Sequence, residues 1–178
     1  LEKTGRLSRS SMQRTIHALR VCQLKLKQHG VTRMRLVATE ACRRAANARE
    51  FIRQVKREAG LQLEIIEPEE EARLAVISCA PLVSTKTEQL LVVDIGGGST
   101  ELVWIDLSSV PQRERPRAIM RLHAGFHPAE SPFAAAKVVD WISVPLGVAT
   151  LRDQFNDVED DSARYALMSW FFEENLAE

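Results

Sequence analysis

Three consecutive glycines between two apolar runs constrain the fold of this chain more than any other feature. Residues 90–102 read LLVVDIGGGSTEL, so a buried strand leads into the glycines and a second strand follows them. Glycine has no Cβ and takes positive φ freely, so successive backbone N–H groups can converge on an anion. A hairpin turn needs one or two glycines, and a third costs conformational entropy. The stretch predicts a strand–turn–strand phosphate loop, with a ligand-free hairpin as the alternative.

Polar side chains around the glycines would complete such a site. Asp94 stands at the strand end, where a Mg²⁺ ion would bridge to phosphate directly or through water. Glu101 is the second candidate metal ligand, although it could instead orient a water molecule or form a salt bridge. The expected N–H and hydroxyl donors to the terminal phosphate are Gly96, Gly97, Gly98, Ser99 and Thr100.

Charge is segregated along a chain whose formal net charge is zero. Residues 1–60 carry 15 Lys and Arg against 4 Asp and Glu, whereas residues 61–178 carry 9 against 20. A basic half indicates a polyanionic partner, and an acidic half is where metal-binding carboxylates are expected. Many of these charges also belong to solvated helix surfaces.

The composition is that of a globular protein. Apolar residues make up 45% of the 178 residues, and no stretch approaches the ~18 apolar residues of a membrane span. The cysteines Cys22, Cys42 and Cys79 form no C-x-x-C pair, which argues against a zinc site and a disulfide framework. This cysteine usage fits a reducing cytoplasm and no secretory leader is visible, so we expect a cytoplasmic protein. We expect neither a membrane nor a nucleic acid as its partner.

Alternating short strands and helices predict an α/β fold with a partly parallel sheet. Before residue 80 we expect helices over 8–28, from about 40, over 47–60 and over 69–78, and strands over 33–38 and 63–66. Beyond it we expect the hairpin, strands over 118–122 and 138–144, and helices over 146–155 and 160–176. Ser8 is a candidate N-cap, and Asn47 with Glu50 forms a capping-box pattern. The polar segment 81–89 is the expected crossing between two domains.

Three glutamates, Glu69, Glu70 and Glu71, follow Pro68 at an expected helix start. Carboxylates in a first turn ordinarily stabilise the helix dipole. Their mutual repulsion would also make at least one of them a better proton acceptor, as a general base requires. The pattern alone leaves both roles open.

Three segments together resemble the exopolyphosphatase and guanosine pentaphosphate phosphohydrolase (Ppx/GppA) family. They are VATEACRRAAN at 37–47, EEEARL at 69–74 and DIGGGSTEL at 94–102, and their order and spacing match as well as their content. Beyond residue 107 the resemblance is thinner, although SVPLG at 143–147 is also similar to the family.

The resemblance implies an actin/Hsp70/sugar-kinase-like (ribonuclease H-like) two-domain architecture with both domains incomplete. Residues 1–80 would form the C-terminal part of the first domain, with the catalytic glutamate. Residues 81–178 would form the start of the second, with the phosphate-binding hairpin. The family opens with a strand and a first phosphate loop that this sequence lacks, so we expect the chain to be a piece of a longer protein.

The same resemblance assigns activation of the attacking water to Glu71, and phosphate binding to Thr39 and Arg43. A helix cap and a surface ion pair are the alternatives for Thr39 and Arg43. The implied reaction is Mg²⁺-dependent release of terminal orthophosphate from inorganic polyphosphate, and the implied assembly is a homodimer of the full-length protein. Guanosine pentaphosphate hydrolysis in the same site and a non-catalytic sensor of polyphosphate or nucleotide are alternatives. An actin-like ATPase or sugar kinase would lack the segment that contains Glu71.

Two other patterns are set aside. His123 and His127 are four residues apart, but Gly125 and Pro128 would break a helix that aligned them for a metal. Trp104, Trp141 and Trp170 are expected in the core and not on a base-stacking surface.

Overall fold

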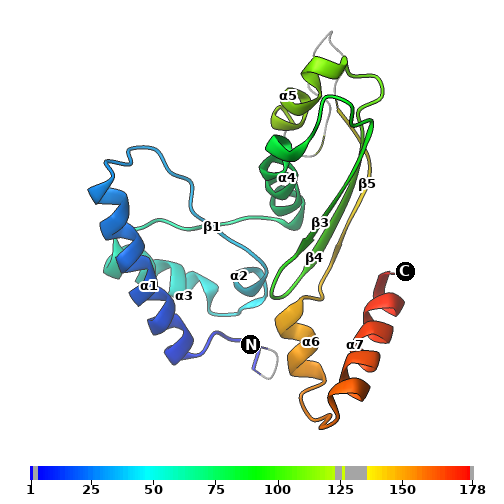
Figure 1. Cartoon of the computed structure of the whole chain (residues 1–178). Coiled ribbons are helices and arrows are strands. Elements are labelled where there is room, and N and C mark those ends of the chain that lie inside the picture. Colours follow the sequence, from blue (N-terminus) through cyan, green and yellow to red (C-terminus); the bar gives the residue numbers. More distant parts are fainter. Residues whose placement is uncertain (2–3, 123–125, 127–135, 177–178) are drawn as a thin grey trace. The chain divides into compact units, whose positions relative to one another are not determined.

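The computed structural model describes residues 1, 4–122, 126 and 136–176, and it comprises two compact units (Figure 1). Unit 1 is Leu1–Glu67 and unit 2 is Pro68–Glu178. This division falls earlier than the expected boundary at 80/81, because the helix after Pro68 packs on the sheet of unit 2. None of the helices in the described ranges is both long and apolar enough to cross a membrane.

Unit 1 combines a helical pair with a short parallel pair of strands. α1 (Arg9–Gln28) packs along α3 (Ala48–Ala59), and the buried side chains of Met12, Ile16, Phe51 and Val55 belong to the core of this unit. Their spacing of four residues puts them on one face of each helix. β1 (Val37–Ala38) pairs in parallel with β2 (Glu64–Ile65), and α2 (Glu40–Arg44) follows β1 (Figure 1). The α/β alternation expected for this part is confirmed.

Two helix ends of unit 1 lie where the sequence predicted them. The Ser8 hydroxyl accepts a hydrogen bond from the backbone amide of Ser11 at 3.1 Å, which caps α1. Gly60 ends α3 in the left-handed region, with φ of 66°, a conformation that glycine adopts without a Cβ penalty.

Asn47 stands at the N-cap position of α3 but does not cap the helix. Its buried side chain accepts a hydrogen bond from Leu7 N at 2.8 Å and donates one to Leu7 O at 3.0 Å. The capping box expected of Asn47 and Glu50 is therefore wrong. The Asn47 side chain is hydrogen-bonded to Leu7, 40 residues away in sequence, and therefore does not accept a bond from the first amides of α3.

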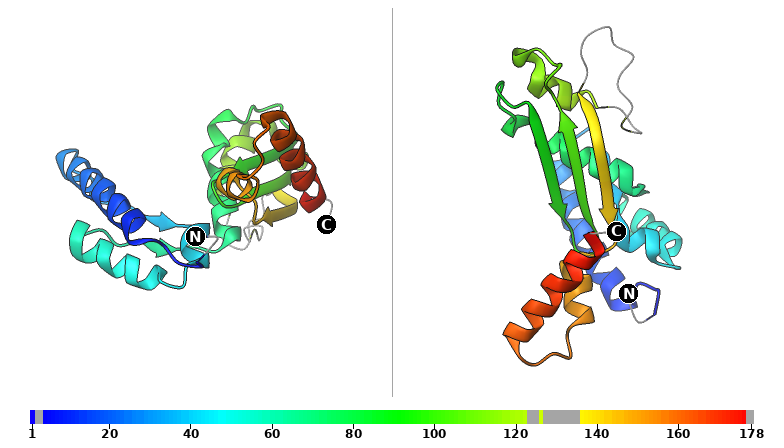
Figure 2. Two further views of the ribbon diagram at one scale, coloured as in Figure 1. Left: turned by 90° about the horizontal axis from the view of Figure 1, so that it is seen from below. Right: turned by 90° about the vertical axis from the view of Figure 1, so that its right-hand side faces the viewer.

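Unit 2 is built on an antiparallel sheet, in which β3 (Gln89–Ile95), β4 (Thr100–Asp106) and β5 (Lys137–Val144) are paired in that order. Figure 2 shows the three strands side by side. α4 (Pro68–Ser78) contacts all three strands. The remaining elements are short 3₁₀ helices at Ala80–Leu82 and Gln112–Glu114, α5 (Arg115–Met120), α6 (Val148–Gln154) and α7 (Asp161–Leu176). The hairpin, the strand at 138–144 and the two last helices are confirmed.

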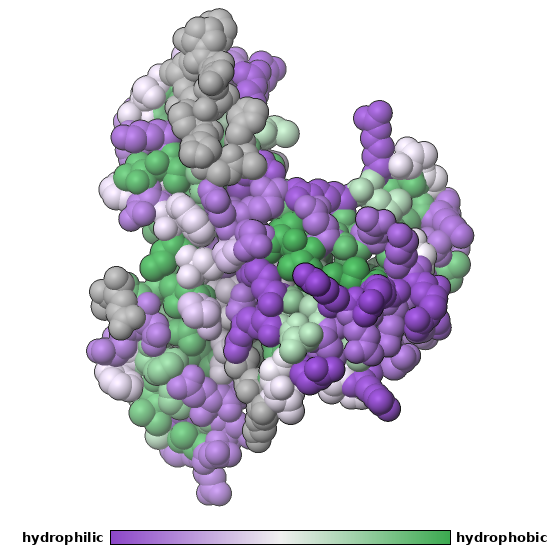
Figure 3. All heavy atoms as spheres, turned by 180° about the vertical axis from the view of Figure 1, so that it is seen from behind, coloured by the Kyte–Doolittle hydropathy of each residue, from purple (hydrophilic) through white to green (hydrophobic). Residues whose placement is uncertain are grey.

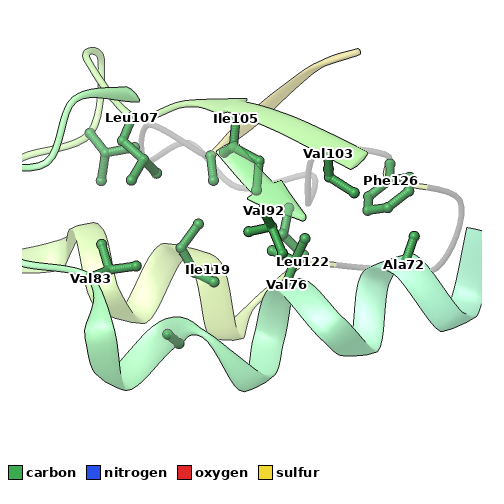
Figure 4. Close-up of a cluster of buried hydrophobic side chains, with 13 residues drawn as sticks. Ala72, Val76, Val83, Val92, Val103, Ile105, Leu107, Ile119, Leu122 and Phe126 are labelled. Atoms are coloured by element: carbon green, nitrogen blue, oxygen red, sulfur yellow. The ribbon is translucent and has the colours of Figure 1, made fainter. Parts of the chain in front are cut away.

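One face of this sheet forms the core of unit 2. Val92, Val103 and Ile105 point from the strands toward Val76 of α4 and Ile119 of α5 (Figure 4). Each of these five side chains is at most 5% exposed. Burying a Val or Ile side chain contributes about 1.5–3 kcal/mol, so this cluster holds the glycine hairpin against α4.

The strand expected over 118–122 is wrong, because most of that segment belongs to α5. Pro116 lies in the first turn of the helix, where its fixed φ is favourable. Ile119 and Leu122 are three residues apart and both are buried in the core of unit 2. Helical spacing lets both of them reach this core.

The expectation that all three tryptophans are core residues is also wrong. Trp104 and Trp170 are 48% and 57% exposed, whereas Trp141 packs against the core of unit 2. Trp104 lies in β4, on the sheet face that also carries the exposed Leu91 and Val93 of β3. This second face of the sheet is apolar although it is exposed.

Candidate active site

The three glycines form the turn between β3 and β4. Cross-strand pairing continues up to Ile95 and Thr100, and Gly96 N donates to Ser99 O at 2.9 Å. Among the described residues, the next three backbone amides, those of Gly97, Gly98 and Ser99, donate no hydrogen bond. The turn thus presents three successive N–H donors, which is the arrangement that binds anions.

The first turn of α6 orients these amides. Val148 N donates to Gly96 O at 3.0 Å and Ala149 N to Gly97 O at 2.8 Å, so both carbonyl groups turn toward α6. In a planar trans peptide the C=O and the following N–H point in opposite directions. The N–H groups of Gly97 and Gly98 therefore point away from α6.

Glycine is needed at this site because it lets two backbone segments approach closely, and not because the loop has positive φ angles. The described glycines with positive φ are Gly5, Gly30 and Gly60, so the positive φ expected of the loop glycines is wrong. A Cβ on Gly147 would lie only 2.5 Å from Gly96 O, so Gly147 is what allows α6 to contact the loop. Sequence reasoning assigned Gly147 no role, and its only signal was its place in the SVPLG segment.

Asp94, Glu101 and Ser143 form a row across the sheet. Asp94 is opposite Glu101 on β3 and β4, and Glu101 is opposite Ser143 on β4 and β5. Side chains at directly opposed positions project from the same face, with Cβ atoms about 4.5–5.5 Å apart. The Ser143 hydroxyl donates to Glu101 Oε1 at 2.9 Å, and Glu101 is 2% exposed. The two expected metal ligands are therefore neighbours.

Burial raises the pKa of Glu101 above its ordinary value. Hydrogen bonds from Ser99 and Ser143 lower this pKa, and the charges of Glu71 and Asp94 raise it. The charges of Glu71 on α4 and Asp94 on β3 thus both act on Glu101 of β4. Such a group of carboxylates favours a cation, because the cation offsets their repulsion.

The two glutamates that precede Ala72 have different environments. Glu70 forms a two-point ion pair with Arg73, at 2.6 and 2.9 Å, and Arg73 donates to Leu122 O at 2.8 Å. Glu70 thus helps to join α4 to the end of α5. Glu71 instead has one buried carboxylate oxygen, Oε2, and its charge acts on Glu101. Of these two glutamates, Glu71 is the one whose charge raises the pKa of Glu101.

Ser99 and Thr100 are both buried at the start of β4. The Thr100 hydroxyl donates to Leu146 O at 2.7 Å, which links β4 to the segment before α6. That bond uses the only hydroxyl proton of Thr100, which in this structure positions the segment before α6. The Ser99 hydroxyl is a hydrogen-bond partner of Glu101.

Thr39 and Arg43 are brought together within unit 1. Thr39 precedes α2, and its side chain makes no capping bond. Arg43 donates to Ile66 O at 2.7 Å and to Glu40 Oε2 at 3.0 Å, so its guanidinium is held at the ends of β1 and β2. The ion pair with Glu40 positions Arg43 near the carboxyl ends of two parallel strands, the edge at which α/β sheets bind ligands.

The carboxylates fit a Mg²⁺ ion by their chemistry. The described residues contain no group of three or more His, Cys, Asp or Glu side chains arranged to hold a metal by themselves. Mg²⁺ is commonly held by one or two carboxylates, and water and substrate phosphates complete its octahedron. Asp94 and Glu101 provide such a pair beside the loop amides. The pattern of His123 and His127 lies outside the described residues.

Comparison with known proteins identifies the family to which the chain belongs. The model of the Ppx/GppA phosphatase family matches residues 1–174. A Ppx/GppA enzyme structure from Aquifex aeolicus is 34% identical, with a TM-score of 0.60, and the match covers 98% of this chain and 49% of that one. An exopolyphosphatase-like protein is 25% identical, with a TM-score of 0.73, over 98% of this chain and 47% of the other.

An exopolyphosphatase structure from Cytophaga hutchinsonii shares the fold, with 21% identity and a TM-score of 0.70, over 96% of this chain and 46% of that one. The chain thus spans about half the length of the solved structures that it matches.

Proposed function

The chain belongs to the Ppx/GppA phosphatase family, and from this premise we propose that it is part of an exopolyphosphatase that releases terminal orthophosphate from inorganic polyphosphate. The observation that carries the proposal is the arrangement of the hairpin. Three free N–H donors at Gly97, Gly98 and Ser99 follow the strand end that carries Asp94 opposite Glu101, and the charge of Glu71 acts on Glu101. Donors for a phosphate beside acceptors for a cation and a water are what phosphoanhydride hydrolysis requires.

In the proposed mechanism the loop amides bind the terminal phosphoryl oxygens. Each charge-assisted bond of this kind contributes on the order of 1.5–3 kcal/mol. Asp94 and Glu101 would hold Mg²⁺, which supplies neutralising charge to the phosphoryl group. Glu71 orients the attacking water and accepts its proton, and the leaving polyphosphate departs opposite the water. Thr39 and Arg43 bind phosphate oxygens in the same proposal.

Polyphosphate is favoured over guanosine pentaphosphate by the charge distribution. Residues 1–60 carry an excess of 11 basic side chains, which suits a long anion better than a single nucleotide. We further propose that the two units are parts of successive actin-like domains, in a cytoplasmic protein that forms a homodimer.

The test uses the full-length protein and measures orthophosphate release with Mg²⁺ from long polyphosphate and from guanosine pentaphosphate. Glu71→Gln removes the proposed base, and Glu69→Gln is its control on the same helical turn. We expect rapid release from polyphosphate that is lost in Glu71→Gln and retained in Glu69→Gln. Orthophosphate release from the nucleotide alone would identify guanosine pentaphosphate, and not polyphosphate, as the substrate. Binding without release from either substrate would indicate a sensor and would overturn the mechanism.

A further inference from the structure

Unit 1 contains a surface cavity of about 410 Å³ beside the end of β2 and the start of α3. Its charged lining consists of Arg43, Arg49 and Glu67. Arg43 is held in place by Glu40 and Ile66 O, as described above. Arg49 is exposed, and no ion pair or side-chain hydrogen bond engages it within the described part of the chain. The cavity therefore has one positioned and one available guanidinium.

A row of basic side chains continues from Arg49 along α3. Arg49, Arg53 and Lys56, which we call the α3 basic row, stand at positions i, i+4 and i+7. In an α-helix these positions lie within about 60° of arc and span ~10 Å along the axis. All three are exposed, and among the described residues none forms an ion pair. The next basic residue, Arg57, pairs with Glu58 at 3.4 Å.

The surroundings of this row are strongly hydrophilic. Purple side chains cover most of the lower right of Figure 3, the part that shows unit 1. The acidic residues of α3 are Glu50 and Glu58, and Glu58 is engaged by Arg20 at 3.0 Å. A row of unpaired basic side chains that ends at a cavity suits a linear polyanion. Such a ligand binds more strongly with each charge contact and does not require a pocket of complementary shape.

The chemistry of unit 1 indicates an anion without bases. Single-stranded nucleic acids are held by aromatic side chains on which successive bases stack, besides the basic groove. The only Phe, Tyr or Trp residue of the sequence from 1 to 67 is Phe51, which is buried in the core of unit 1. The surface of this unit thus offers charge and no stacking platform.

We propose that the α3 basic row and the adjoining cavity of Arg43 and Arg49 together bind a stretch of a long polyphosphate chain. The row is then a determinant of chain-length preference. This inference rests on the proposed function for the identity of the substrate. Its binding test does not depend on turnover.

The experiment compares two charge reversals of equal size in the full-length protein. Arg53→Glu with Lys56→Glu alters the row, and Lys25→Glu with Lys27→Glu makes the same change of net charge on exposed positions of α1. Binding of fluorescently labelled long polyphosphate and of tripolyphosphate is measured by anisotropy at one fixed salt concentration. Circular dichroism of both variants verifies that they fold.

We expect the row variant to bind long polyphosphate about tenfold more weakly, because two cationic contacts are lost and replaced by like charges. Tripolyphosphate binding should fall less, and the α1 variant should stay within about twofold of the parent. Equal losses in both variants, or none in either, would overturn the proposal. Equal competition by single-stranded RNA would overturn the choice of polyphosphate. If no substrate is hydrolysed, the proposed function fails while the binding comparison still decides this inference.

Discussion

Gly147 lies so close to Gly96 that a Cβ at position 147 would be 2.5 Å from the Gly96 carbonyl oxygen. The same added atom would also be 2.5 Å from Gly98 N. Both contacts are with backbone atoms, which a side-chain rotation does not relieve. The relationship ties the position of α6 to the direction of the loop amides.

Gly147→Ala should therefore destabilise the protein and disturb the loop. Overpacking of this kind costs about 1–3 kcal/mol in free energy of unfolding, measured by urea denaturation. Gly97→Ala is the matched control, because its Cβ would meet only Ala149 Cβ, at 4.0 Å. We expect the control to change stability by less than about 1 kcal/mol. Equal stability of the two variants would contradict the close packing.

Glu101→Gln should change how stability depends on pH. The pKa of Glu101 is raised in the folded state, mainly by burial, so the folded protein holds this proton more tightly than the unfolded chain. The stabilisation is complete below the ordinary value of 4.5 and is lost as the pH rises through the folded pKa. Glu101→Gln removes this loss.

The measurement is urea denaturation at a series of pH values with a chelator present. The advantage of Glu101→Gln over the parent should grow from acidic to neutral pH, whereas Glu69→Gln should run parallel to the parent. A difference in the free energy of unfolding between Glu101→Gln and the parent that is constant with pH would show that folding does not shift the pKa of Glu101.

Asn47→Ala should destabilise unit 1, because the Leu7 N–H and C=O groups lose their partner together. Two part-buried hydrogen bonds at 2.8 and 3.0 Å are removed, and the expected loss is about 1–3 kcal/mol in free energy of unfolding. Asn47→Asp keeps the acceptor for Leu7 N but loses the donor to Leu7 O, so its stability should lie between those of the parent and Asn47→Ala. Asn156→Ala, at an exposed position, should change stability by less than about 0.5 kcal/mol. A loss no larger than that of Asn156→Ala would show that Asn47 does not hold Leu7.

The cysteines should differ in reactivity toward a thiol reagent. Burial raises the pKa of the Cys42 thiol, and its thiolate, the reactive form, is correspondingly scarce at mildly alkaline pH. Cys22 is exposed on α1. Mass spectrometry after brief alkylation should find Cys22 modified and Cys42 intact, and the difference should disappear in urea. Rapid modification of native Cys42 would contradict its burial in unit 1.

The sequence by itself determined the features that depend on neighbouring residues. The apolar runs on both sides of the glycines predicted the β3–β4 hairpin, and Ser8 and Gly60 marked two helix ends, because caps and turns are local interactions. The resemblance of three segments predicted membership of the Ppx/GppA family, which the family match over residues 1–174 confirmed. The roles of Glu71, Arg43 and Thr39 remain predictions.

The tertiary structure alone decided what depends on partners distant in sequence. Residues 118–122 are apolar enough for a strand, and burial of Ile119 and Leu122 in the core of unit 2 made most of them helical. The Asn47 side chain binds Leu7 instead of capping α3. Gly147 matters because α6 packs on the glycine loop, where a Cβ at position 147 would clash. Local pattern cannot weigh such contacts, because their free energy comes from side chains and backbone groups that only folding brings together.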